Sequence, residues 1–257
     1  MKKYYKIYEA ISRNNSKIYN FKTEALFQVL FSKISYFFTP IFIIFKITPN
    51  TITFMNFIVS IFSIILILNG KGSFLEYGIL LYLVYRIFDF CDGAVARHFK
   101  QSTFYGRFID GLADIFLNSF LILSLAFYSF QIFESLPLLI FGCVTGILTS
   151  FDTFIYDRYS ALARWSNSEN RIKVLPYIKK TFMPKSTNLY SDLITILLVV
   201  MPFLKFNESI HYTNLFLFFS IFTVSAFQNI IIHLYFAQTN LKLQAKVKNR
   251  AKTQKKH

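Results

Sequence analysis

The sequence predicts an all-α integral membrane protein with six transmembrane helices, an amino-terminal interfacial helix and both termini in the cytoplasm. Composition is the first reason: 54% of the 257 residues are hydrophobic and 16% are charged, against roughly 25% charged residues in a soluble domain. Aromatic content is the second, with 33 phenylalanines. So much apolar surface is hard to bury in a water-soluble core of this size, whereas lipid accepts it.

Six apolar stretches are long enough to cross about 30 Å of hydrocarbon. They cover residues 51–68, 74–90, 108–130, 136–156, 189–204 and 214–236. Residues 25–45 are also apolar, but Lys33 and Pro40 interrupt this stretch and Lys46 bounds it. A helix lying in the membrane interface fits these residues better than a span.

Basic residues predict the side of the membrane on which each connection lies, because lysine and arginine accumulate in cytoplasmic loops. The segments before the first span, between the second and third, between the fourth and fifth, and after the sixth are rich in them. The other connections are short and poor in basic residues. We therefore expect a cytoplasmic and interfacial segment over residues 1–48, a six-helix membrane domain over 49–236 and a basic cytoplasmic tail over 237–257.

The basic tail has two interpretations. Its charges are Lys242, Lys246, Lys248, Arg250, Lys252, Lys255 and Lys256. Such a run could bind nucleic acid. Beside a membrane domain, attraction to anionic headgroups explains it more simply, at about 1 kcal/mol per basic residue. We therefore expect membrane lipids as a partner and no nucleic acid.

Four aspartates fall where the second span ends and the third begins: Asp89, Asp92, Asp110 and Asp114. A carboxylate at the bilayer centre costs roughly 2.5–3.5 kcal/mol and less near the boundary, so such residues usually line a cavity and bind something. Spacings of three and four place each pair on one helix face. The short segment between the pairs makes the two helices antiparallel neighbours, with all four carboxylates around one pocket. Oxygen ligands without His or Cys suit magnesium or manganese, which usually bind together with a phosphate.

Small and basic residues flank the aspartates. Gly93, Ala96 and Gly106 lack side-chain bulk, which leaves space for a nucleotide close to the backbone. Arg97 and Arg107 could bind phosphate oxygens. Both also fit ordinary anchoring on the cytoplasmic side of the membrane.

These residues resemble the signature of the CDP-alcohol phosphotransferase family, D-x-x-D-G-x-x-A-R-x8-G-x3-D-x3-D. The residues that match it, at every spacing, are Asp89, Asp92, Gly93, Ala96, Arg97, Gly106, Asp110 and Asp114. The preceding Thr48, Pro49, Asn50 and Thr53 resemble the Thr-Pro-Asn-x-x-Thr stretch that commonly opens the first membrane helix in that family; by itself this stretch indicates only a helix start. The close resemblance covers about residues 48–114, and the remainder matches only in topology.

The resemblance implies a homodimer of six-helix protomers that holds a nucleotide pyrophosphate with two Mg²⁺ or Mn²⁺ ions per site at the cytoplasmic boundary of the membrane. Asp89, Asp92 and Asp110 would be metal ligands, and Asp114, also near metal, would deprotonate the acceptor hydroxyl. The residues implied on the nucleotide side are Pro49, Asn50, Thr53, Gly93, Ala96, Arg97 and Gly106. In relatives that use phosphorylated acceptors, basic residues after the fourth helix bind the acceptor phosphate, which makes Arg158 and Arg164 candidates; membrane anchoring is their alternative role.

The activity implied is metal-dependent transfer of a phosphatidyl group from CDP-diacylglycerol to an alcohol, with release of CMP, in phospholipid biosynthesis at the bacterial inner membrane. The alternative is transfer of phosphocholine or phosphoethanolamine from a CDP-alcohol to diacylglycerol. By analogy, the compact six-span chain favours the first.

Two other classes remain open. An aspartate-rich prenyltransferase also binds pyrophosphate through magnesium, but it predicts a second aspartate cluster, and the later acids form none: Asp152, Asp157, Glu169, Asp192 and Glu208. A cation transporter would carry its carboxylates at the bilayer midplane, whereas these lie at helix ends. Asp152 and Asp192 could contact a polar cavity, mark helix boundaries or pair between helices.

Overall fold

The computed structural model describes residues 2–16, 24–70, 73–101, 103–170 and 185–254. All regular secondary structure in these ranges is α-helical, which confirms the predicted all-α class. The helices are α1 (Lys2–Asn15), α2 (Leu26–Ile44), α3 (Pro49–Asn69), α4 (Phe74–Phe99), α5 (Phe104–Phe133), α6 (Leu136–Asn170), α7 (Lys185–Leu204) and α8 (Glu208–Gln254).

Helices α3 to α8 coincide with the six predicted spans, but the helices that are apolar enough to cross a membrane are a different set. By length and composition, five described segments qualify: Leu26–Ile44, Pro49–Asn69, Phe108–Phe133, Leu136–Leu162 and Glu208–Tyr235. Helix α2, which we expected in the interface, is one of them. Helix α4 does not qualify because it carries several charges, and the apolar part of α7, Leu189–Leu204, is shorter.

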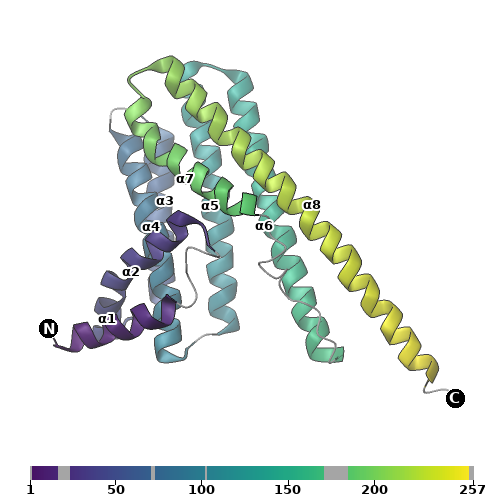
Figure 1. Ribbon diagram of the computed structural model, residues 1–257. Helices are drawn as coiled ribbons and strands as arrows, with labels where there is room; N and C mark the ends of the chain where they lie inside the picture. Colours follow the sequence, from purple (N-terminus) through teal and green to yellow (C-terminus); the bar gives the residue numbers. More distant parts are fainter. Residues whose placement is uncertain (1, 17–23, 71–72, 102, 171–184, 255–257) are drawn as a thin grey trace.

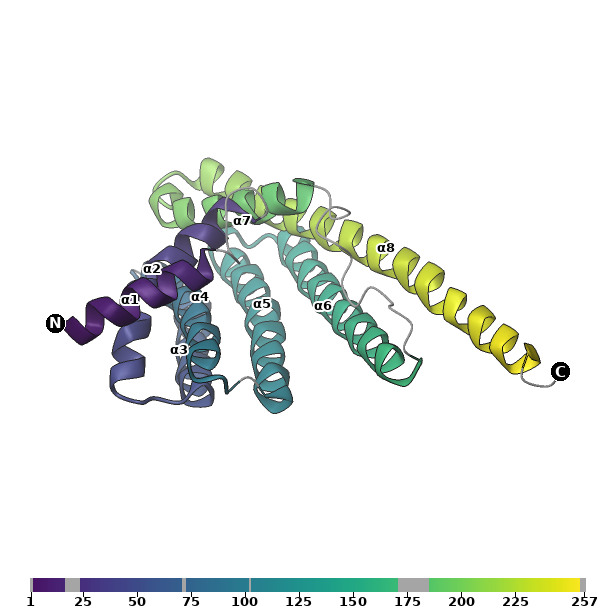
Figure 2. The ribbon, with the colours of Figure 1, turned by 60° about the horizontal axis from the view of Figure 1, so that its bottom comes forward.

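The helices form a bundle whose helix ends gather at two opposite ends (Figure 1). The end of α3, the start of α4 and the turns between α5 and α6 and between α7 and α8 lie at the upper end, whereas the end of α4, the start of α5, the end of α6, the start of α1 and the end of α8 lie at the lower end. This arrangement agrees with the charge pattern of the connections. Figure 2 shows α3, α4 and α5 side by side, with the carboxyl-terminal part of α8 extending away from them.

The largest hydrophobic core of the described residues fills the upper part of the bundle, where α3, α4, α5, α6, α7 and α8 meet. It includes the fully buried Leu121, Leu125, Phe218 and Phe219. Helices α5 and α6 approach closely because Gly142 has no side chain: a Cβ atom there would lie 2.5 Å from the Cβ of Ala126. The polar residues of α3, α4 and α5 lie outside this core, towards the opposite end of the bundle.

Two aspartates whose role the sequence left open are partners between helices. Both oxygens of Asp192, on α7, accept hydrogen bonds from the first backbone amides of α2, those of Leu26 and Phe27, each at 2.9 Å. These amides have no partner within their own helix, so Asp192 caps α2 from another helix. On α6, Asp152 Oδ2 accepts a hydrogen bond of 3.1 Å from the side-chain amide of Asn229 on α8.

Candidate active site

Local sequence determines where the three helices around the site begin and end. Thr48 caps α3, accepting a hydrogen bond from the Thr51 amide at 3.3 Å. Thr103 caps α5 in the same way, with its hydroxyl 2.9 Å from the Gly106 amide. Helix α4 ends at Phe99, and the capping residue that follows, Lys100, adopts a left-handed φ of 55°. These short-range signals reverse the chain between α4 and α5 and place the four aspartates at the same end of the bundle.

Helix α3 packs closely against both α4 and α5, whereas the backbones of α4 and α5 lie farther apart in the described part of the chain and these two helices meet through side chains such as Tyr85 and Leu117. Three of their carboxylates converge, as expected for antiparallel neighbours, but α3 lies closer to each of the two helices than they lie to each other. The aspartate side chains consequently face one another across an open space, and this space can admit a ligand.

Three carboxylates converge in that space. One oxygen each from Asp89, Asp92 and Asp110 lies within 4.8 Å of the others, and Asp92 is only 6% exposed. Carboxylates gathered this closely repel one another, so a bound cation would stabilise the arrangement. Oxygen-only ligands suit Mg²⁺ or Mn²⁺. The residues present therefore fit a divalent metal site.

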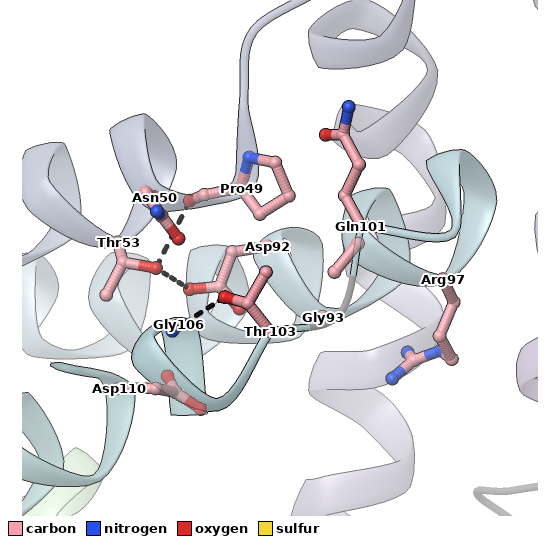
Figure 3. A pocket seen from close by; sticks show the side chains of 11 residues that line it. Pro49, Asn50, Thr53, Asp92, Gly93, Arg97, Gln101, Thr103, Gly106 and Asp110 are labelled. Carbon is pink, nitrogen blue, oxygen red and sulfur yellow. Dashed lines mark hydrogen bonds between the residues drawn. The ribbon is translucent and has the colours of Figure 1, made fainter. Parts of the chain in front are cut away.

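Thr53 on α3 fixes the orientation of one of these carboxylates. Its hydroxyl donates a hydrogen bond of 2.6 Å to Asp92 Oδ2 and lies 3.2 Å from the carbonyl oxygen of Pro49 (Figure 3). Groups that orient metal ligands in this way influence metal affinity although they do not bind the metal themselves. The Thr-Pro-Asn-x-x-Thr stretch thus contributes to the aspartate cluster as well as to the pocket.

Asp114 lies apart from this group of three. Its Oδ1 accepts a hydrogen bond of 2.9 Å from the hydroxyl of Tyr85, a residue that is 2% exposed. The half-buried guanidinium of Arg86 interacts electrostatically with both Asp89 and Asp114. Sequence reasoning missed both α4 residues. Arg86 had a detectable signal, since it is a charged residue inside an apolar stretch and lies three positions before Asp89 on the same helix face.

A cavity of about 310 Å³ opens beside the aspartates. All seven residues predicted for nucleotide binding line it, together with Asp92 and Asp110, and Gln101 and Thr103 complete the lining (Figure 3). A Cβ atom at Gly106 would lie 3.3 Å from Asn50 Oδ1, and one at Gly93 would lie 3.2 Å from Arg97 Nη1. The two glycines therefore keep the cavity wide where α3, α4 and α5 meet.

Arg97 is held from outside the bundle. Its Nη2 donates a hydrogen bond of 3.1 Å to Asn15 Oδ1, at the end of α1. The amino-terminal helix therefore contacts a residue that lines the cavity. The side chain of Arg107, the other predicted basic neighbour, lies outside the described part of the structure.

The residues predicted for the acceptor are less closely associated with the cavity. Arg158 is exposed on α6 and does not line the cavity. The neighbouring Asp157 turns towards α5 instead, with its Oδ2 3.6 Å from the position of a Cβ atom at Gly111. For Arg164 only the backbone, within α6, is described.

Comparison with known proteins agrees with this site. The family model for CDP-alcohol phosphatidyltransferase matches residues 46–225, which include α3, α4, α5 and the whole aspartate cluster. The chain belongs to this family. A search among curated proteins finds no match.

Family membership implies an enzyme that transfers a phosphate-containing group from a CDP-alcohol donor to an alcohol acceptor. Members are typically metal dependent, and the three converging carboxylates of this chain could bind a metal ion. Membership argues against the prenyltransferase and the cation transporter that the sequence left open.

Proposed function

We propose that this protein transfers the phosphatidyl group of CDP-diacylglycerol to an alcohol acceptor and releases CMP, as a step of phospholipid biosynthesis in the bacterial inner membrane. The observation that carries the proposal is the convergence of Asp89, Asp92 and Asp110 beside a cavity lined by residues of α3, α4 and α5. In the proposed orientation this cavity faces the cytoplasm, where the nucleotide is available.

A lipid donor suits the surroundings of the site. Three apolar side chains of α5 on either side of Asp110 are exposed: Tyr105 by 65%, Phe108 by 64% and Leu112 by 53%. Exposed apolar surface of this kind can contact acyl chains while the polar groups of the donor occupy the cavity. The compact chain favours CDP-diacylglycerol as the donor over CDP-choline or CDP-ethanolamine.

The proposed reaction is a single displacement at phosphorus. The acceptor oxygen forms a bond to the phosphorus that carries diacylglycerol, and the bond from that phosphorus to the bridging oxygen of the pyrophosphate breaks. CMP leaves with the bridging oxygen, while Asp114 accepts the proton of the acceptor hydroxyl. Asp89, Asp92 and Asp110 would hold two Mg²⁺ or Mn²⁺ ions, with Asp114 nearby. When bound, these ions would neutralise the charge of the pyrophosphate.

Two further features of the proposal come from the family resemblance. The protein would act as a homodimer. Arg158 and Arg164 would bind the phosphate of a phosphorylated acceptor, if that is the acceptor class used.

The test is CMP release by purified protein in lipid micelles with Mg²⁺ or Mn²⁺. CDP-diacylglycerol, CDP-choline and CDP-ethanolamine are supplied separately, each against a panel of acceptor alcohols. We expect turnover of CDP-diacylglycerol that requires metal. Asp114→Asn should abolish it, because the amide cannot accept the acceptor proton. Turnover only with CDP-choline or CDP-ethanolamine would reverse the assignment of the donor, and no turnover of any donor by folded, metal-bound protein would disprove the proposal.

A further inference from the structure

The four aspartates of the signature are held by different partners. Asp89, Asp92 and Asp110 direct oxygens towards a common point, and Asp92 is fixed from α3 through Thr53. Asp114 is fixed from α4 instead, through the 2.9 Å hydrogen bond from the Tyr85 hydroxyl to its Oδ1. This bond joins two helices whose backbones are not in close contact in the described part of the chain.

Tyr85 itself is held rigidly. Its side chain is 2% exposed and packs in a small buried cluster with Ile64 of α3 and Leu117 of α5. The side-chain amide of Asn56 donates a hydrogen bond of 3.2 Å to the Tyr85 carbonyl oxygen. A buried tyrosine hydroxyl needs a hydrogen-bond partner, and a rigid ring leaves this one few positions. The phenol therefore determines where Asp114 Oδ1 lies.

The next residue of α4 adds a charge to the same place. Arg86 interacts electrostatically with both Asp114 and Asp89. Its positive charge makes two nearby carboxylates less costly to hold inside the bundle. The charge of Arg86 acts on both aspartates, whereas the Tyr85 hydroxyl makes a directional hydrogen bond to Asp114. Because the hydrogen bond is directional, the orientation of the Asp114 carboxylate depends on Tyr85.

We propose that Tyr85 is a positioning residue for the acceptor side of the reaction. Its hydroxyl engages Oδ1 of Asp114, which leaves Oδ2 as the oxygen that receives the proton of the acceptor hydroxyl. Tyr85 does not touch the substrate and acts only through Asp114. This inference rests on the proposed transferase activity and names the residue that makes one aspartate of the four available for proton transfer.

The test compares Tyr85→Phe with Tyr128→Phe. Tyr128 is a matched control, because it is also 2% exposed and its hydroxyl is 2.9 Å from a side-chain partner, His211 Nε2. Tyr128 belongs to the hydrophobic core in the upper part of the bundle. Each substitution removes one buried hydroxyl and leaves the ring, so the general cost to folding is similar.

CMP release is measured for both variants against the concentrations of donor, acceptor and Mn²⁺. We expect Tyr85→Phe to lower kcat by about tenfold to a hundredfold, the range for one hydrogen bond to a charged group. The donor KM and the Mn²⁺ concentration for half-maximal rate should stay as in the wild type, because the three converging carboxylates are untouched. Tyr128→Phe should leave all of these quantities near their wild-type values.

Three results would overturn the inference. Equal losses of kcat in the two variants would show that Tyr85 matters only as a buried hydroxyl. A raised Mn²⁺ requirement in Tyr85→Phe at unchanged kcat would make Tyr85 a support for metal binding. In either of these two cases, CMP release by the wild type would leave the proposed function standing while the role of Tyr85 falls. The third result is a wild type that releases no CMP from any donor, which would overturn both the proposed function and the role of Tyr85.

Discussion

Two regions of the helix bundle that hold aspartates differ in what surrounds the carboxylates. Between α3, α4 and α5, three carboxylates bring oxygens within 4.8 Å of one another beside a cavity. Between α6 and α8, Asp152 accepts a hydrogen bond from Asn229 and has Nδ1 of the buried His233 3.8 Å from its Oδ1. The first arrangement places like charges together, whereas the second gives one carboxylate neutral or basic neighbours. The difference teaches that clustering of buried aspartates, more than burial alone, indicates a ligand site.

The largest effect that this comparison predicts is that of Asp92→Asn. Loss of one charged metal ligand should reduce CMP release by at least about a hundredfold, because the remaining carboxylates cannot hold the metal in place. Without metal, the same substitution removes repulsion from the cluster, so we expect the free energy of unfolding to rise by about 0.5–2 kcal/mol. Activity and metal-free denaturation of the purified protein measure the two effects. A variant that is inactive and also less stable without metal would contradict our view of the cluster as a repulsive site.

The next effect concerns the hydroxyl that orients Asp92. Thr53→Val keeps the shape of the side chain but removes the 2.6 Å hydrogen bond to Asp92 Oδ2. Partners of metal ligands typically change metal affinity by about tenfold to a hundredfold. We therefore expect a higher Mn²⁺ concentration for half-maximal CMP release, with a maximal rate close to the wild type.

Thr149→Val is the control for this substitution, because the Thr149 hydroxyl is also buried and, within the described residues, donates to the backbone of its own helix, at Thr145 O, 2.9 Å away. An unchanged Mn²⁺ requirement in Thr53→Val, or an equal change in both variants, would show that Thr53 does not orient a metal ligand.

Much of the fold and of the site followed from local sequence. Hydrophobic runs predicted α3 to α8, and the spacing of Asp89 and Asp92 placed both on one face of α4, because helical periodicity depends on positions along a single segment. What the sequence missed depends on contacts between segments. Sequence order placed α4 and α5 as neighbours, but it did not show that α3 packs closely against both. Pro40 and Lys33 favoured an interfacial position for α2, whereas its length and mean composition also suit a span.

Contacts between single residues that are distant in sequence could not be predicted either. The hydrogen bonds from Tyr85 to Asp114 and from Arg97 to Asn15 join residues 29 and 82 positions apart. No periodicity relates such positions, so only the packed structure brings them together.

The smallest predicted effect is that of Asp152→Asn, which tests the other half of the comparison. The asparagine keeps the shape of the side chain and can still accept a hydrogen bond from Asn229, but the charge is lost. Hydrogen bonds between membrane helices contribute about 0.6 kcal/mol on average, and here the bond is weakened without being removed, so we expect the free energy of unfolding to fall by no more than about that amount. CMP release per folded molecule should not change, because the residue lies between α6 and α8 and does not line the cavity. Denaturation and activity assays on the same preparation separate these quantities. A large loss of activity at nearly unchanged stability would show that this isolated aspartate also serves the reaction, and that clustering does not distinguish the two regions.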